Sequence, residues 1–206
     1  QNMISMVAGL ASTGKRPILY GIAPFMSLRV LEQITLDLAA MNLPVTIASV
    51  GAGFTYSTDG SSHLGLQDTA AVMTVPNLEV LNSSDPASTR LFAASTVTAT
   101  GPRYVRIVKG ELPTLHRENP DWYIEGFGKV RSGTDKLLLV STGALVHEVI
   151  MAAEKLDSAF GINPSVVDVS RLRPFPHRHL MKLVSGAEQV VVVEESYAAL
   201  SLHAGM

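Results

Sequence analysis

The 206-residue sequence contains no cysteine, which excludes disulfide bonds, thiolate metal ligands and a cysteine nucleophile. It also lacks an excess of one charge, because 16 basic and 18 acidic residues leave a formal net charge of -2. We therefore expect neither nucleic acid nor an anionic membrane surface as a partner. No run approaches about 18 uninterrupted apolar residues, so no transmembrane helix is expected. Because disulfides are excluded, we expect a cytoplasmic protein.

Apolar residues are plentiful, at 47% of the sequence, and can fill one large core or two smaller ones. Their spacing alternates between the periods of helices and strands. In the first half, the predicted strands are residues 17–22, 45–50, 78–81 and 103–108. The predicted helices are residues 2–12, 24–41 and 64–75, with a fourth that begins at Asp85-Pro86. Helical connections between strands favour a parallel sheet covered on both faces.

The composition changes between residues 110 and 135, where glycine, proline, aromatic and charged residues follow one another without sustained periodicity. Such a stretch is typical of a linker between domains. Beyond it, the predicted strands at 136–141, 165–169 and 189–193 alternate with the predicted helices at 145–159 and 177–184. We therefore predict an α/β protein of two successive parallel-sheet domains, namely a first domain at residues 1–115, a linker at 116–135 and a partial second domain at 136–206.

A polar loop after the predicted strand 45–50 is the first candidate for a site. It opens with Gly51-Ala52-Gly53 and contains Asp59 and His63. Ligands of parallel α/β proteins bind outside the carboxyl ends of strands, where glycines let a ligand approach closely. The alternative is a tight turn at Asp59-Gly60 with His63 at the start of a helix.

A pair of carboxylates, Glu194 and Glu195, follows the last predicted strand. Paired carboxylates can act as acid and base when their environments differ. Neighbouring residues of a strand point to opposite faces, however, so we do not expect these two side chains to share one site.

Six motifs occur in an order that is found in a known family. They are Gln1-Asn2-Met3-Ile4-Ser5-Met6, Ile22-Ala23-Pro24-Phe25, Leu43-Pro44-Val45, Gly51-Ala52-Gly53-Phe54, Asp59-Gly60-Ser61-Ser62-His63 and Lys109-Gly110-Glu111-Leu112-Pro113. In this order they resemble the C-terminal half of transketolases, and most closely the C-terminal subunit of split transketolases. The resemblance covers essentially the whole sequence.

The resemblance implies a pyrimidine-binding domain at residues 1–115, followed by part of the transketolase C-terminal domain. In the family, thiamine diphosphate lies between this domain and a diphosphate-binding N-terminal subunit or domain of another protomer. That partner holds most of the magnesium or calcium site, so no metal ligand is expected in this chain. The implied substrates are sugar phosphates, the implied reaction is two-carbon ketol transfer, and the implied assembly is a dimer or heterotetramer.

The family's site residues carry over to five positions of this sequence. Phe25 matches the aromatic residue that packs on the cofactor's aminopyrimidine ring, and Ile22 replaces a second aromatic residue of the same wall. Asp59 matches an aspartate that binds a substrate hydroxyl, and His63 matches the catalytic histidine near the reacting carbon. Lys109 stands where transketolases often have an arginine for the sugar phosphate.

Two departures leave alternatives open. Gly51 stands where many transketolases have a substrate-binding histidine. The family's activating glutamate would directly precede Gln1, so we expect the sequence to be a fragment, with a non-catalytic assembly or regulatory subunit as the alternative. The enzymatic alternatives are the β subunit of a 2-oxoacid dehydrogenase and deoxyxylulose-phosphate synthase. The combination of Asp59, His63 and Lys109 favours the sugar enzyme.

Overall fold

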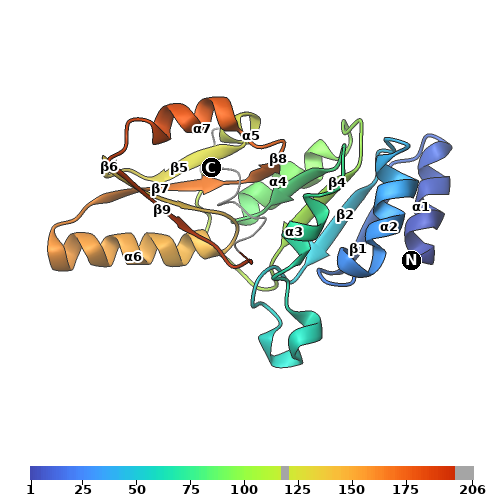
Figure 1. The fold of residues 1–206 in the computed structure, drawn as a ribbon, viewed down its shortest axis with the longest axis horizontal. Helices are drawn as coiled ribbons and strands as arrows, with labels where there is room; N and C mark the ends of the chain where they lie inside the picture. Colours follow the sequence, from blue (N-terminus) through green and yellow to red (C-terminus); the bar gives the residue numbers. More distant parts are fainter. Residues whose placement is uncertain (117–120, 198–206) are drawn as a thin grey trace.

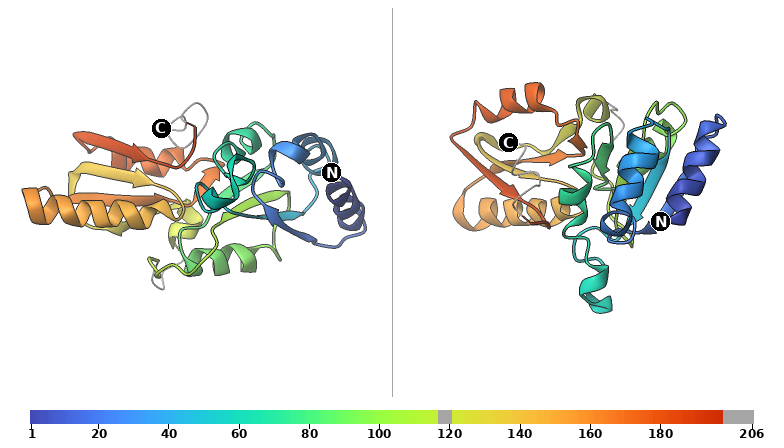
Figure 2. Two further views of the ribbon diagram at one scale, coloured as in Figure 1. Left: turned by 90° about the horizontal axis from the view of Figure 1, so that it is seen from below. Right: turned by 45° about the vertical axis from the view of Figure 1, so that its right-hand side comes forward.

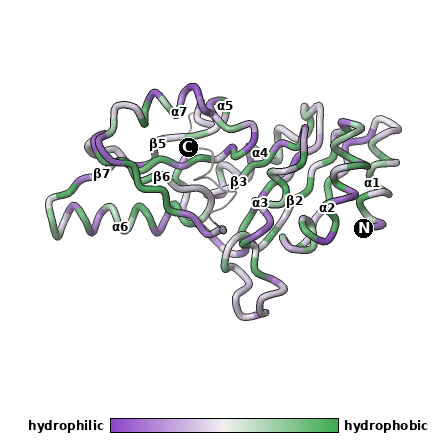
Figure 3. Tube along the Cα trace, viewed as in Figure 1, coloured by the Kyte–Doolittle hydropathy of each residue, from purple (hydrophilic) through white to green (hydrophobic). Residues whose placement is uncertain are grey.

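The computed structural model describes residues 1–116 and 121–197. Figure 1 shows two lobes side by side, each built on one β-sheet, and the views in Figure 2 show that helices cover both sheets. The first sheet has the strand order β1-β2-β4-β3-β8, and the second has the order β5-β7-β6-β9. Figure 3 shows hydrophobic colouring in β2 and β6, inside the two sheets, and both hydrophilic and hydrophobic colouring along α7.

Four strands of the first sheet are parallel and come from the predicted segments. They are β1 (Ile18–Ile22), β2 (Thr46–Val50), β3 (Glu79–Asn82) and β4 (Arg103–Ile107). In the strand register, Ile22 lies opposite Val50, and Val50 lies opposite Ile107. The three strands therefore end at the same edge of the sheet, and the segments that follow them start side by side.

The helices of this lobe are α1 (Asn2–Ser12), α2 (Leu31–Gln33), α3 (Asp68–Val72) and α4 (Pro86–Ser95). The predicted start of α4 is confirmed, because the Asp85 carboxylate accepts the Ser88 N–H at 2.7 Å and the Ser88 hydroxyl accepts the Asp85 N–H at 3.0 Å. This reciprocal capping satisfies two backbone donors of the first turn.

Two of the predicted helices are shorter than expected. Instead of one helix from residue 24 to 41, residues 24–27 form turns, and a 3-10 turn at Leu28–Val30 leads into α2 and a π-helical stretch at Ile34–Ala39. The Met26 N–H donates to the Ile22 carbonyl at 3.0 Å, so the chain first turns back on β1. The helix predicted over residues 64–75 is limited to α3, because residues 64–67 close the loop after β2.

The second sheet is formed by β5 (Phe127–Arg131), β6 (Thr134–Ser141), β7 (Pro164–Val169) and β9 (Gln189–Val193). Its helices are α5 (Asp121–Glu125), α6 (Leu145–Phe160) and α7 (His177–Val184). The predicted linker at 116–135 therefore contains a strand, and β5 pairs with β7 in antiparallel orientation. The charged and glycine residues of β5 obscure the alternation of apolar and polar residues from which a strand is predicted.

The two lobes share one strand and one core. β8 (Arg171–Arg173) follows β7 but joins the first sheet, where it pairs with β3 in antiparallel orientation. The largest group of buried apolar side chains combines Tyr104 and Val80 of the first lobe with Val167 and Leu138 of the second. Both sheets are thus mixed, and the fold is two α/β units joined through a continuous apolar core.

Candidate functional site

The loops at the carboxyl edge of the first sheet are tied to one another by backbone hydrogen bonds. After β1, the Ala23 N–H donates to the Val50 carbonyl at 2.8 Å. After β2, the Gly51 N–H donates to the Ile107 carbonyl at 2.9 Å. The segments after β1, β2 and β4 therefore start from one fixed edge, which is where parallel α/β sheets bind ligands.

The loop at residues 54–64, which we call the projecting loop, extends from this edge away from both lobes (Figures 1 and 2). Its base is closed by two hydrogen bonds, from the Gly53 N–H to the Gly65 carbonyl at 3.0 Å and from the Gly65 N–H to the Gly53 carbonyl at 2.9 Å. A side chain at Gly65 would overlap the Gly51 carbonyl, so the two arms can approach this closely only with glycine there.

The structure brings two of the predicted site residues into contact. The rings of Phe25 and His63 meet edge to face, with centroids 5.1 Å apart and planes at 74°. Ser62 Oγ lies 3.0 Å from His63 Nδ1, which leaves Nε2 as the ring nitrogen for an external partner. On the Phe25 ring, the Arg29 guanidinium lies 4.4 Å from the centroid, a cation–π contact that the sequence did not suggest.

The other predicted residues border this contact at different points. Ile22 ends β1 with a half-buried side chain, and its carbonyl accepts the Phe25 N–H at 2.9 Å. Asp59 is exposed on the projecting loop, in the 3-10 turn Ser57–Asp59. The Lys109 ammonium follows β4 and lies 5.7 Å from the ring centroid of Tyr56. Among the side chains of these five residues, those of Phe25 and His63 are in contact.

Gly51 has a structural reason to lack a side chain. Its φ angle is +92°, and a Cβ atom there would overlap the ring of Tyr56. The space that a side chain at position 51 would need is therefore filled by the Tyr56 ring, which is also the ring that lies near Lys109.

A buried ion pair supports the projecting loop from beneath. Arg106 of β4 donates to both carboxylate oxygens of Asp68 in α3, at 2.8 and 3.1 Å, and to the Gly65 carbonyl at 2.9 Å. Tyr104 adds its hydroxyl to Asp68 at 3.0 Å, and Ser49 lies 2.6 Å from the same hydroxyl. The network connects two strands of the sheet to the second arm of the loop.

Charge and burial oppose each other at Arg106 but act in the same direction at Tyr104. Burial opposes the charge of Arg106, but the adjacent Asp68 carboxylate outweighs burial and raises the pKa of the guanidinium. Burial and then the Asp68 charge raise the pKa of the Tyr104 phenol well above its usual value. The phenol is therefore a hydrogen-bond donor, and the guanidinium is charged.

The structure corrects the expectation that Glu194 and Glu195 cannot share one site. β9 ends at Val193, so the strand alternation no longer applies to them. Both side chains border one small cavity between the lobes, together with Arg106, Asn82 and other polar residues. Burial is the main cause that raises the pKa of Glu195, and the Arg106 charge and the Phe54 N–H oppose it.

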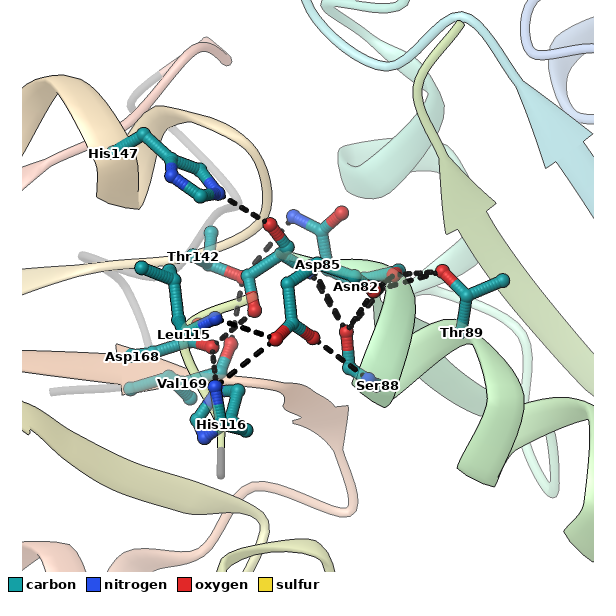
Figure 4. Close-up of polar contacts among 12 residues, drawn as sticks. Asn82, Asp85, Ser88, Thr89, Leu115, His116, Thr142, His147, Asp168 and Val169 are labelled. Carbon is teal, nitrogen blue, oxygen red and sulfur yellow. Dashed lines mark hydrogen bonds and ion pairs between the residues drawn. The ribbon is translucent and has the colours of Figure 1, made fainter. Parts of the chain in front are cut away.

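A second buried polar cluster, which the sequence did not reveal, joins the two lobes at the residues that follow β3 (Figure 4). Asp168 of β7 is its centre, with one carboxylate oxygen 2.5 Å from Ser84 Oγ and 2.7 Å from His116 Nε2. The His116 ring stacks on Trp122 at 3.9 Å. From α6, His147 Nε2 donates to the Ser84 carbonyl at 2.8 Å. These contacts cross from one lobe to the other, and we interpret them as a structural junction.

Asp85 links the same junction to α4. Besides capping that helix, its carboxylate accepts the N–H groups of Leu115 and His116 at 2.8 and 3.0 Å. Burial raises its pKa, but these backbone donors, with that of Ser88, outweigh burial and lower it. The adjacent carboxylates Asp85 and Asp168 are thus shifted in opposite directions, since burial raises the pKa of Asp168.

The described part of the chain has neither a cluster of metal ligands nor a membrane-spanning helix. Residues 1–116 and 121–197 contain no group of three or more His, Asp or Glu side chains that could hold a metal ion. Within the same residues, no helix is long and apolar enough to cross a membrane.

Comparison with protein families matches both lobes. Residues 1–114 match the model described as transketolase, pyrimidine binding domain, and residues 126–206 match transketolase, C-terminal domain. A 6-deoxy-6-sulfo-D-fructose transketolase subunit of Clostridium sp. strain MSTE9 is 29% identical over 195 residues, which are 95% of this chain and 60% of the relative. An apulose-4-phosphate transketolase subunit of Actinobacillus succinogenes is also 29% identical, over 95% of this chain and 62% of the relative.

A longer relative and a solved structure also match this chain. A 1-deoxy-D-xylulose-5-phosphate synthase of Rhodococcus jostii is 33% identical over all of this chain but only 31% of its own length. A solved structure titled split gene transketolase, inactive beta4 tetramer, superimposes with a TM-score of 0.85 at 26% identity, over 99% of this chain and 65% of that one. The chain thus spans 60% to 62% of the length of the two relatives named as transketolase subunits.

The family assignment rests on the sequence match and agrees with the fold. The order of the motifs predicted a transketolase C-terminal half, and the fold of two α/β units confirms that prediction. The match to the pyrimidine-binding model alone covers more than half of this chain, so the chain belongs to the transketolase family.

Proposed function

We propose that this chain is the C-terminal portion or subunit of a transketolase that moves a two-carbon ketol unit from a ketose phosphate to an aldose acceptor. The family assignment supports a thiamine-diphosphate-dependent transferase. The finer statement is supported by the two relatives whose names describe subunits of sugar transketolases. A cytoplasmic location stays a prediction from the composition.

The observation that carries the proposal is the contact between Phe25 and His63 at the carboxyl edge of the first sheet. An aminopyrimidine is a planar heteroaromatic ring, and an aromatic side chain offers it a stacking face. An imidazole beside that face can donate or accept a proton at neutral pH. A stacking group and an acid–base group at one place fit the cofactor's pyrimidine half.

The cofactor, when bound, supplies the nucleophilic carbon that two-carbon transfer needs and that no side chain provides. In our proposal, Phe25 orients the aminopyrimidine ring, and Ile22 adds an apolar wall beside it. His63 holds or moves a proton at Nε2, because Ser62 engages Nδ1. Asp59 accepts a hydrogen bond from a substrate hydroxyl, and Lys109 binds the sugar phosphate as a point charge.

A partner subunit or an N-terminal region completes the site in this proposal. The chain corresponds to 60% to 62% of its split-transketolase relatives, whose names call them subunits. The projecting loop extends away from both lobes, so a second surface can close over it (Figure 1). We propose that this partner holds the diphosphate and its magnesium or calcium ion, and that the assembly is a dimer or heterotetramer.

We also propose domain boundaries that follow the two sheets. The first domain keeps the predicted range of residues 1–115, and the two family matches support a division near that point. The second domain starts near residue 126 instead of 136, because β5 pairs within the second sheet. This shortens the predicted linker and leaves residues 136–206 as the bulk of the second domain.

The relative from Rhodococcus jostii favours one enzymatic alternative, deoxyxylulose-phosphate synthesis, which consumes pyruvate. A direct assay separates the two. The complete natural chain is mixed with its partner, thiamine diphosphate and magnesium, and then supplied with a ketose phosphate and an aldose, or with pyruvate and an aldose phosphate. We expect two-carbon transfer in the first mixture; turnover of pyruvate without ketol transfer would contradict the proposal.

A further inference from the structure

We propose that Glu195, a residue of the second lobe, is a positioning residue for the transfer reaction, because it anchors the projecting loop and through the loop the imidazole of His63. The inference rests on the function proposed above and adds to it a residue outside the pyrimidine-binding domain. Glu195 touches neither Phe25 nor His63, so its effect passes through the backbone of the loop.

The contacts of Glu195 and its neighbours hold both arms of the loop. The Phe54 N–H, at the start of the first arm, interacts with the Glu195 carboxylate and acts to lower its pKa. A Cβ atom at Gly53 would overlap this carboxylate, so the carboxylate lies directly against the backbone. On the second arm, the Tyr197 N–H donates to the Leu66 carbonyl at 3.3 Å. Residues 195–197 thus contact the loop on either side of its base.

Charge strengthens this anchor. Glu195 is half-buried and faces the charge of Arg106, which also pairs with Asp68 and donates to the Gly65 carbonyl. Hydrogen bonds to a charged acceptor are stronger than those between neutral groups, and partial burial increases the difference. The Glu195 carboxylate of the second lobe therefore contacts the first arm of the loop, and the Arg106 guanidinium of the first lobe contacts the second arm.

The position of His63 depends on this base because the loop itself lies at the surface. None of residues 54–64 is buried. Phe54 directly follows Gly53, and His63 lies two residues before Gly65, the other half of the closing backbone pair. A shift of the base thus moves the imidazole relative to the Phe25 ring, and misplacement of a catalytic group by about 1 Å can cost about 100-fold in rate.

The test uses the complete natural chain with its partner and compares Glu195→Ala with Glu195→Gln. Glutamine keeps an acceptor oxygen for the Phe54 N–H, whereas alanine removes it. The matched control is Glu188→Gln, because Glu188 lies just before β9, with a side chain that is 68% exposed and paired with Lys136 at 2.8 Å. Amide hydrogen exchange of residues 53–65, kcat, the KM values and thermal unfolding are measured for each variant.

We expect Glu195→Ala to speed exchange in residues 53–65 by about tenfold or more, as loss of one hydrogen bond to a charged group predicts. The same variant should lower kcat by about 10- to 100-fold at a nearly unchanged KM for thiamine diphosphate. Glu195→Gln should restore most of both properties, and Glu188→Gln should change neither. Exchange in the strands of the second sheet should stay as in the natural chain.

Three results would contradict the proposal for Glu195. One is unchanged loop exchange in Glu195→Ala; another is faster exchange with an unchanged kcat. The third is an equal loss of protection in both sheets that glutamine does not restore, because that would mean general unfolding. A natural chain with no two-carbon transfer, by contrast, would overturn the proposed function itself, while the exchange result would still report on the anchor.

Discussion

The imidazole ring of His63 lies edge-on to the phenyl ring of Phe25, with centroids 5.1 Å apart. The two residues come from the segments that follow β1 and β2, and neighbouring strand ends bring them together. A hydrogen bond from the Ala23 N–H to the Val50 carbonyl connects the two segments. The pair combines a stacking group with an acid–base group, so substitution of each member should affect a different kinetic property.

Replacement of His63 by alanine should lower turnover far more than cofactor affinity. General acid–base catalysis by a positioned side chain contributes at least about 100-fold, and we expect kcat to fall by that order. Steady-state assays with titration of thiamine diphosphate measure both quantities. The control is His177→Ala, since His177 meets Phe175 edge to face at 4.9 Å in the second lobe. An unchanged kcat in His63→Ala would refute the assignment.

Replacement of Phe25 by alanine should mainly weaken cofactor binding. Loss of the stacking face and of the apolar contact should raise the apparent KM for thiamine diphosphate about tenfold, with most of kcat kept at saturation. Phe25→Tyr keeps a ring of the same shape and should bind nearly as the natural chain does. If the alanine variant binds the cofactor normally but turns over slowly, the ring serves His63 and does not stack on the cofactor.

Lys109 should distinguish phosphorylated from unphosphorylated substrates. A charge-assisted contact to phosphate is worth more than a neutral one, so Lys109→Ala should raise the KM for a sugar phosphate by about tenfold. The KM for the corresponding free sugar should not change. Lys109→Arg keeps the charge and adds a bidentate fork, so it should bind the phosphate at least as well. Equal losses for both sugars would place Lys109 outside phosphate recognition.

The sequence predicted the elements whose signal is local. Apolar runs of four to six residues located the four parallel strands of the first sheet, and an acceptor side chain before proline located the start of α4. The polar loop after β2 was found because glycines and polar residues directly follow a buried strand. Phe25 and His63 were assigned by resemblance, and the structure then brought their rings into contact.

The features that the sequence did not predict depend on contacts between distant segments. β8 has three residues, two of them arginines, and forms only because β3 offers a free edge. Glu195 was set aside because the alternation of strand side chains was applied beyond the last predicted strand, which ends, as β9 does, at Val193. The junction of Ser84, His116 and Asp168 combines three segments that share no pattern. The periodicity of apolar residues indicates which side chains are buried, but not which distant segment they contact.

The buried ion pair of Asp68 and Arg106 should contribute strongly to stability. Its side chains are 0% and 6% exposed, and removal of one partner leaves an uncompensated buried charge. We expect Asp68→Ala to lower the free energy of unfolding by about 3–5 kcal/mol, measured by urea denaturation. The matched control is Asp135→Ala, which removes an exposed partner of Lys129 and should have little effect. Similar losses in both variants would contradict this account.

The two buried carboxylates of the interlobe junction should give opposite pH dependences of stability. Burial raises the pKa of Asp168 above 3.8, so the folded chain binds this proton more tightly than the unfolded chain does. The stability that Asp168 contributes is therefore complete below pH 3.8 and is lost as the pH rises through the raised pKa. Relative to Asp168→Asn, the natural chain should become less stable over that rise.

Asp85 should behave in the opposite way, because its backbone donors outweigh burial and lower its pKa below 3.8. Its contribution is complete above pH 3.8 and is lost as the pH falls through the lowered pKa. The advantage of the natural chain over Asp85→Asn should therefore grow as the pH rises. Urea unfolding of the natural chain and both variants between about pH 3 and pH 7 measures the two differences. Differences of the same sign would mean that one of the two carboxylates does not carry the charge that its contacts imply.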